Sequence, residues 1–200
     1  MYLLNKMLDA MIEGLIFNMD YKINIAGLDR FLPLCRVNDD LYIGAFVMFG
    51  DVEITMKASS ELLKRAPEFD VIITAESKGI PLAYEMSRIS GKPYVVARKE
   101  SKLYMKDIVK VSDRSITTAH DQELCLGKSD CELMEGKQIL LVDDVVSTGG
   151  SMEAISSLVE AVGGIVAAKM AVLAEGDSMM RKDMIYLENL PLFNPDGSIK

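Results

Sequence analysis

Two adjacent acids, Asp143 and Asp144, follow a short apolar run and precede a loop of small residues. Their carboxylates can accept hydrogen bonds from two sugar hydroxyls or help to hold a hydrated magnesium ion, with Asp143 as the candidate metal residue. The loop offers backbone N–H groups and hydroxyls at the start of a helix, which suits a phosphate dianion. The candidate binding residues of this segment are Val145, Val146, Ser147, Thr148, Gly149, Gly150 and Ser151.

Two acids repel a bare phosphate unless a sugar or a metal ion lies between them. The segment 139–151 therefore favours a phosphorylated sugar over inorganic phosphate as its ligand. The alternative is an acid pair that only caps the following helix, but the context of the pair is far more specific than a cap requires.

A second candidate anion loop follows the apolar run 70–74, and a helical pattern comes directly after it. Lys78 supplies a positive charge, and Gly79 permits a close approach of the ligand. Glu76 and Ser77 complete the loop. An alternative for Glu76 is a structural role, either as a cap or as a bridge to another segment.

A basic stretch follows the run 93–97. Four of the nine residues from 98 to 106 are basic, in a chain whose net charge is -8. A solvated charged loop is the ordinary explanation of such a stretch. Because this one adjoins both candidate anion loops, we expect a flexible loop that closes over the ligand and excludes water. Its candidate residues are Arg98, Lys99 and Lys102 for binding, with Tyr104 and Lys106 in the same loop.

The elements that must position these segments alternate along the chain. Strand-length apolar runs occupy 70–74, 93–97, 138–142 and 165–174, and helical patterns occupy 81–90 and 151–162. This alternation predicts an α/β fold with a mostly parallel sheet and helices on both faces. Ligands of such sheets bind beyond the carboxyl ends of the strands, where the three candidate segments lie.

Smaller elements are expected outside this core. The apolar spacing of residues 3–16 predicts an amphipathic helix, and Asp51 is expected to cap a helix that starts at Val52. Short strands are expected at 22–26, 41–49, 108–111, 115–119 and 123–126. The tail after residue 174 contains three glycine or proline interruptions near its end and is expected to be largely irregular.

The composition limits the classes of function. Two hundred residues suit one domain, and the net charge of -8 argues against nucleic-acid binding. No apolar run approaches the length of about 20 residues that a membrane span needs. Cys35, Cys125 and Cys131 suit free thiols in a reducing cytoplasm better than a disulfide framework. With His120 as the single histidine, a mixed Cys/His zinc site is not expected.

Residues 142–150 resemble the motif with which type I phosphoribosyltransferases bind 5-phosphoribosyl-1-pyrophosphate (PRPP). Residues 75–79 match the position of that family's pyrophosphate loop, whose backbone often carries a cis peptide. Arg98 and Lys99 resemble the stretch that leads into its flexible loop. The resemblance covers about 70–174. It is closest to the adenine and xanthine phosphoribosyltransferases and to the ligand domain of the purine-operon repressor.

The resemblance implies one type I phosphoribosyltransferase domain over residues 1–200. Its core would span about 51–175, and a small hood from about 1–50 and 176–200 would cover the base. The resemblance also implies Mg²⁺ as a cofactor and a homodimer. Its activity would be purine salvage, in which phosphoribosyl passes from PRPP to a purine base, foremost adenine, and pyrophosphate is released.

The resemblance also implies a role for each candidate residue. Asp143 and Asp144 would bind the ribose hydroxyls, with proton handling by Asp144, and the small-residue loop would bind the 5-phosphate. The second loop and the basic stretch would bind pyrophosphate, and Lys102 could equally serve the neighbouring subunit.

The identity of the acceptor base stays open at this point. Residues 125–128 read Cys-Leu-Gly-Lys where adenine enzymes usually carry Glu-Tyr-Gly-Lys, and Leu34 replaces the polar residue expected of a xanthine enzyme. One alternative is therefore an enzyme for xanthine or another base. The other is a regulatory protein that senses PRPP or purines without turnover.

Overall fold

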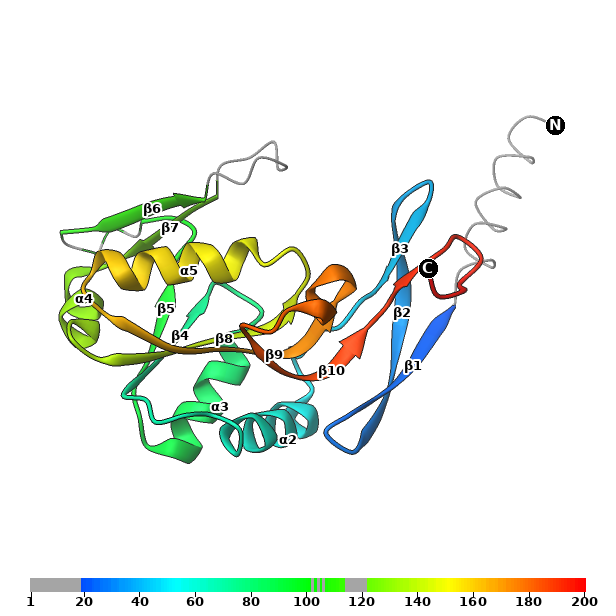
Figure 1. Cartoon of the computed structure of the whole chain (residues 1–200), viewed down its shortest axis with the longest axis horizontal. Helices are drawn as coiled ribbons and strands as arrows, with labels where there is room; N and C mark the ends of the chain where they lie inside the picture. Colours follow the sequence, from blue (N-terminus) through cyan, green and yellow to red (C-terminus); the bar gives the residue numbers. More distant parts are fainter. Residues whose placement is uncertain (1–18, 102, 104, 106, 114–121) are drawn as a thin grey trace.

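The structure is a computed structural model, and it describes residues 19–101, 103, 105, 107–113 and 122–200 (Figure 1). Several predictions made from the sequence lie outside the described residues. They are the N-terminal helix, the strand 115–119, His120, and the loop residues Lys102, Tyr104 and Lys106.

A five-stranded parallel sheet forms the centre of the fold, in the order β10-β9-β8-β4-β5. Its strands are β4 (Val71–Ala75), β5 (Tyr94–Ala97), β8 (Gln138–Val146), β9 (Ile165–Glu175) and β10 (Ile185–Leu190). The first four confirm the expected apolar runs. The residues of β4 are all buried, as a strand covered on both faces requires.

Helices cover both faces of this sheet, which confirms the predicted fold class (Figure 1). The helices are α2 (Val52–Leu63), α3 (Ile80–Ser90), the short α4 (Lys128–Met134) and α5 (Gly150–Ala161). α2 and α3 pack on one face and α5 on the other. Asp51 caps α2 as predicted, because its carboxylate accepts the N–H of Ile54 at 3.1 Å. Gly91 ends α3 with a φ of +69°.

A second, antiparallel sheet joins residues near the two ends of the described chain, in the order β1-β2-β3-β11. Its strands are β1 (Asp20–Ile25), β2 (Leu28–Asn38), β3 (Leu41–Gly44) and β11 (Leu192–Phe193). β1 and β3 confirm two expected strands, although β3 is shorter than the range 41–49. β2 was not expected, because most of its residues are exposed and its sequence shows no long apolar alternation.

The expectation of a largely irregular tail is wrong. The helical turn η1 (Gly176–Met180) follows β9, β10 then joins the central sheet, and β11 joins the second sheet. Pro191 lies between β10 and β11, where a residue without an N–H is tolerated and the chain changes sheets. The sequence pattern does not predict β10, because it is an edge strand in which apolar and polar residues are mixed.

A two-stranded ribbon of β6 (Val109–Asp113) and β7 (Gln122–Leu126) confirms two of the expected short antiparallel strands. Arg98 and Cys125 exchange backbone hydrogen bonds of 3.0 and 2.8 Å, which tie the ribbon to the chain leaving β5. None of the helices in the described ranges is long and apolar enough to cross a membrane.

Candidate ligand-binding site

Three of the predicted segments meet in one cavity of about 260 Å³. Its lining includes residues 76–78 after β4 and Lys99 after β5. It also includes Asp143 and Asp144 in the last part of β8, and Ser151 in the first turn of α5. β4 pairs with both β5 and β8, so the segments that follow these parallel strands reach the same edge of the sheet. Parts of the chain that are far apart in sequence therefore line a single cavity.

The two acids have different surroundings. Asp144 is 3% exposed, and its Oδ2 has no hydrogen-bond partner among the described residues, although Lys78 Nζ lies 3.5 Å away. Asp143 accepts the backbone N–H of Asp144 at 2.9 Å. Burial, together with the charge of Asp144, raises the pKa of the Asp143 carboxyl above its usual range. A buried carboxylate oxygen without a partner is costly, so the pair suits a ligand that brings hydroxyl donors or positive charge.

The loop after β8 forms a small hollow at the N-terminus of α5. Gly149 caps the helix with a φ of +87°, a conformation that favours glycine. The hollow measures about 40 Å³ and is lined by Asp143 and residues 145–152, which include every residue predicted for this loop. Ser178 supports the loop by donating its hydroxyl to the carbonyl of Ser147. This geometry fits the predicted phosphate site.

The loop after β4 contacts the acid pair directly. Its Glu76–Ser77 peptide bond is cis, a feature that the family resemblance implied. A Cβ atom built on Gly79 would overlap Oγ1 of Thr74 and lie 3.0 Å from Oδ1 of Asp143. Glycine at this position therefore lets the two loops approach each other.

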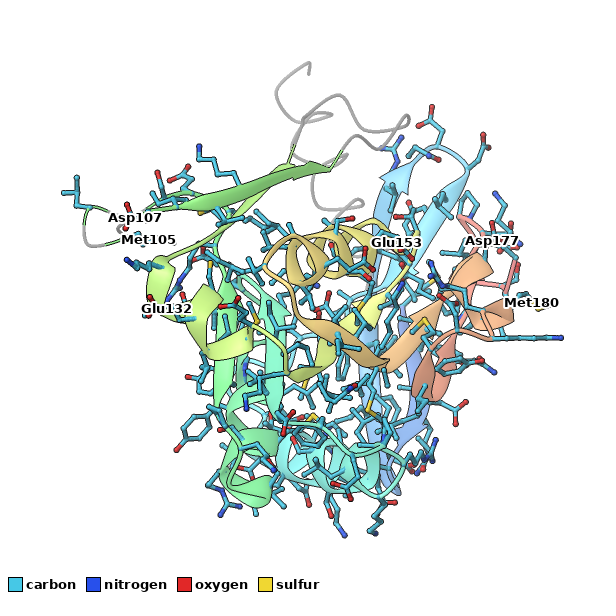
Figure 2. The ribbon with its side chains drawn as sticks, turned by 60° about the vertical axis from the view of Figure 1, so that its left-hand side comes forward. Met105, Asp107, Glu132, Glu153, Asp177 and Met180 are labelled. Carbon is cyan, nitrogen blue, oxygen red and sulfur yellow. The ribbon has the colours of Figure 1, made fainter. Side chains whose placement is uncertain are left out.

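Glu76 bridges this loop to the basic stretch. Its carboxylate accepts the backbone N–H of Lys99 at 3.2 Å and Nη1–H of Arg98 at 3.4 Å. Glu76 therefore forms a structural bridge, and it also lines the cavity of the acid pair. Lys99 lines the cavity of the acid pair, as predicted. Arg98 instead lines a neighbouring cavity of about 550 Å³, together with Met105 and Glu132, which Figure 2 shows close to α4.

A larger cavity of about 660 Å³ lies between the loop after β8 (residues 147–151), called the phosphate loop below, and the second sheet. The second sheet and its flanks supply an apolar wall of Val37, Leu41, Ile43 and Leu192, and the phosphate loop supplies Ser147 and Thr148. The remaining lining residues include Glu175 at the end of β9 and, after that strand, Asp177, Ser178 and Arg181. Such a cavity, with an apolar wall opposite polar groups, suits a planar organic ring that carries polar atoms at its edge.

Glu175 is the buried acid of this larger cavity and is 8% exposed. Burial raises the pKa of its carboxyl. Glu175 was not among the predicted site residues, although the rule that located the other segments applies to it. It is the last residue of a parallel strand, whereas the predicted segments follow only the three strands that precede it in the chain.

The positions at which the sequence departs from its relatives lie elsewhere. Leu34 packs with Tyr42 and Phe193 inside the second sheet rather than on the wall of the larger cavity. Cys125 is buried in β7, and Lys128 lies 3.7 Å from Asp107 at the start of α4. Leu34, Cys125 and Lys128 therefore do not line the larger cavity.

Comparison with known proteins agrees with this geometry. Residues 52–190 match the phosphoribosyl transferase domain family. The chain is 35% identical to the adenine phosphoribosyltransferase of Agathobacter rectalis over 142 residues, which are 64% of this chain and 76% of that protein. It is 34% identical to the enzyme of the same name from Chlorobium chlorochromatii, over 72% of this chain and 77% of that protein.

The fold also matches a solved structure. The crystal structure of adenine phosphoribosyltransferase from Thermoanaerobacter pseudethanolicus superposes with a TM-score of 0.59. The match covers 86% of this chain and 95% of that chain at 22% identity, which shows a common fold. The chain belongs to the phosphoribosyltransferase family and has its type I fold, as the motifs indicated. It is accordingly an enzyme that transfers phosphoribosyl groups.

Proposed function

We propose that this enzyme transfers the phosphoribosyl group of PRPP to adenine and releases pyrophosphate, a reaction of purine salvage. The observation that carries the proposal is the pair of loops around the buried Asp144, directly beside a cavity with an apolar wall. Among the described residues, Oδ2 of Asp144 accepts no hydrogen bond. The curated relatives to which the chain is about one third identical over the aligned residues are named for adenine.

In this reaction a bond forms between a ring nitrogen of adenine and the anomeric carbon of ribose, and the bond from that carbon to pyrophosphate breaks. The ring nitrogen loses its proton, which Asp144 is proposed to accept. The enzyme has to position two reactants and stabilise charge on the leaving group. Residues 147–151 hold the 5-phosphate, and Asp143 and Asp144 bind the ribose hydroxyls. Lys78 and Lys99, which line the same cavity, face the pyrophosphate. Arg98 contributes by fixing Glu76.

The acid pair also fits a magnesium ion that arrives with PRPP. Among the described residues there is no cluster of three or more metal-ligating side chains. Mg²⁺ does not need one, because it commonly keeps several waters and binds through one or two carboxylates plus substrate phosphates. Asp143 and Asp144 would hold it through its waters. Bound Mg²⁺ would neutralise charge on the departing pyrophosphate.

A panel of bases tests the proposed acceptor. Purified enzyme with PRPP and Mg²⁺ is expected to release pyrophosphate in the presence of adenine, and far more slowly with hypoxanthine, guanine or xanthine. A clear preference for xanthine would identify a xanthine phosphoribosyltransferase and contradict adenine as the acceptor. Tight PRPP binding without turnover for any base would identify a sensor and overturn the proposal.

In its ionised form Glu175 is expected to favour adenine, because an ionised carboxylate only accepts hydrogen bonds and adenine carries an amino group. Hypoxanthine has a carbonyl oxygen at that position and would face the carboxylate unfavourably. Glu175→Gln, whose amide also donates, is expected to lower kcat/KM for adenine about tenfold. The preference for adenine over hypoxanthine is expected to narrow by about tenfold or more. Steady-state kinetics with both bases measures the two changes.

Glu160→Gln is the matched control, since Glu160 is an exposed acid of α5 outside the cavities described above. It should leave both kinetic constants unchanged. If Glu175→Gln keeps the wild-type preference between the two bases, Glu175 does not read the amino group.

We further propose a homodimer formed through α3 and the edge strand β5. Tyr84, Ile89 and Tyr94 are exposed there, and the rings of Tyr84 and Tyr94 lie 6.3 Å apart in an edge contact. Large apolar side chains gathered on a surface favour association. Light scattering of the purified protein tests this, and a monomer at micromolar concentration would exclude it.

The proposal includes the hood and the location that the sequence analysis expects. The second sheet acts as the hood of a single domain, because its strands provide the apolar wall of the larger cavity.

The site of action is proposed to be the cytoplasm. The three cysteines are free thiols, which supports a reducing compartment.

A further inference from the structure

A cluster of four charged side chains lies beside the phosphate loop, and the reaction as described makes no use of it. Arg181, which follows η1, donates from Nε and Nη2 to the two carboxylate oxygens of Asp183 at 2.9 and 2.6 Å. Its Nη2 also donates to Glu153 at 2.7 Å. Lys169 on β9 donates to both oxygens of Glu153 at 3.0 and 3.1 Å. Figure 2 shows Glu153 on α5 and Asp177 on the neighbouring η1.

The arginine of this cluster touches the phosphate loop. A Cβ atom built on Gly149 would overlap Nη1 of Arg181 and lie 3.2 Å from its Cζ. Two carboxylates thus hold one side of the guanidinium, and the remaining nitrogen faces the backbone of the loop. The Arg181 side chain is only 23% exposed, so its position is well confined.

The charge balance of the cluster matters because of where Glu153 stands. Glu153 lies in the first turn of α5, immediately after the loop that receives the 5-phosphate. A carboxylate there stabilises the isolated helix but repels a phosphate dianion at the same helix end. Arg181 and Lys169 cancel the charges of Glu153 and Asp183, so the cluster as a whole is neutral. Removing Arg181 leaves one uncompensated negative charge next to the phosphate site.

We propose that Arg181 is a positioning residue for the 5-phosphate: it neutralises Glu153 and holds the loop at Gly149 in its phosphate-binding conformation. The inference rests on the proposed function, in that the loop must receive a ribose 5-phosphate group. It adds a residue from the far end of the chain that no sequence motif marks. Arg181 acts through the loop and through Glu153, and takes no part in bond making.

The test uses the full chain and ribose 5-phosphate, a probe that carries the 5-phosphate without pyrophosphate. Titration calorimetry of Arg181→Gln is expected to show a dissociation constant about tenfold above wild type, which corresponds to about 1.4 kcal/mol. Adding Glu153→Gln to this variant removes the uncompensated charge and should restore most of the affinity. Because salt screens charges, the defect of Arg181→Gln should also shrink between about 0.02 and about 0.5 M salt. In turnover, KM for PRPP should rise while kcat stays near wild type.

Arg88→Gln is the matched control, since Arg88 also forms a bidentate pair with a carboxylate, that of Glu85, but on α3. Unchanged affinity in a folded Arg181→Gln protein would overturn the proposal. So would a loss of affinity that neither salt nor Glu153→Gln relieves, because that result indicates a purely structural role. Failure of the wild type to bind ribose 5-phosphate would instead sink the proposed function, so the two failures are distinguishable.

Discussion

Replacing Asp143 and Asp144 together by asparagine is expected to weaken PRPP binding by about 100- to 10,000-fold. Each carboxylate is proposed to accept a hydrogen bond from a ribose hydroxyl, and a charge-assisted hydrogen bond contributes about 1.5–3 kcal/mol. The amide keeps the size of the side chain but loses the charge and presents two donors to hydroxyls and magnesium. Equilibrium titration of the double variant with PRPP and Mg²⁺ measures the loss.

The Asp143→Asn part of this substitution should not harm the fold, which helps to separate a binding defect from misfolding. The pKa of Asp143 is raised to about 8 in the folded chain, against about 4 in an unfolded chain. The folded state therefore binds this proton more tightly, and stability falls as the pH rises from about 4 to about 8. An asparagine side chain does not titrate, so without ligand Asp143→Asn should be more stable than wild type at pH 8, by at least about 1 kcal/mol.

Urea unfolding at pH 5 and pH 8, in the absence of magnesium and PRPP, checks the stability prediction. The advantage of Asp143→Asn over wild type should be larger at pH 8. Wild-type affinity for PRPP in the double variant would remove the acid pair from the site. Equal pH dependence in the two proteins would show that burial of Asp143 carries no cost.

Gly79→Ala is expected to lower kcat/KM for PRPP by about 100-fold. Gly79 has φ -73° and ψ -9°, so alanine fits the backbone conformation and the effect is purely steric. The added methyl group would displace Thr74 and push against Asp143. A displacement of about 1 Å in a positioning residue costs a rate factor of this size. Steady-state kinetics over a range of PRPP concentrations measures the change.

Gly127→Ala is the control for this experiment. Gly127 also has a negative φ, but a Cβ there would meet its nearest neighbours at 3.8 Å, an ordinary contact distance. It should stay close to wild type in activity and melting temperature. If Gly79→Ala remains within about threefold of wild type, the contact between the two loops does not govern catalysis.

The central sheet and the ligand loops were predictable from the sequence because local and long-range signals agree in them. Each buried strand is a short apolar run, and each run is followed by residues that stand out by chemistry, such as Asp143 and Lys78. Because parallel strands bring their carboxyl ends to one edge of the sheet, these runs were enough to predict that the loops lie at that edge.

The second sheet and the larger cavity were less accessible from the sequence. β2, β10 and β11 are partly exposed or very short, so their sequences show no clear alternation of apolar and polar residues. Their pairing is decided by contacts between segments near opposite ends of the described chain. Arg181 illustrates the same limit, because its importance follows from its distance to Gly149 and not from its neighbours in sequence.

The pairing of β11 with β3 has a consequence for how the enzyme is made. During synthesis β1, β2 and β3 leave the ribosome early. β3 cannot pair with β11, however, until nearly all of the described chain has emerged. The wall that includes Ile43 and Leu192 closes only then. Strands that are far apart in sequence pair late, because the entropy cost of closing the long loop between them comes before the stabilising contacts form. A nascent chain should therefore complete the apolar wall of the larger cavity last.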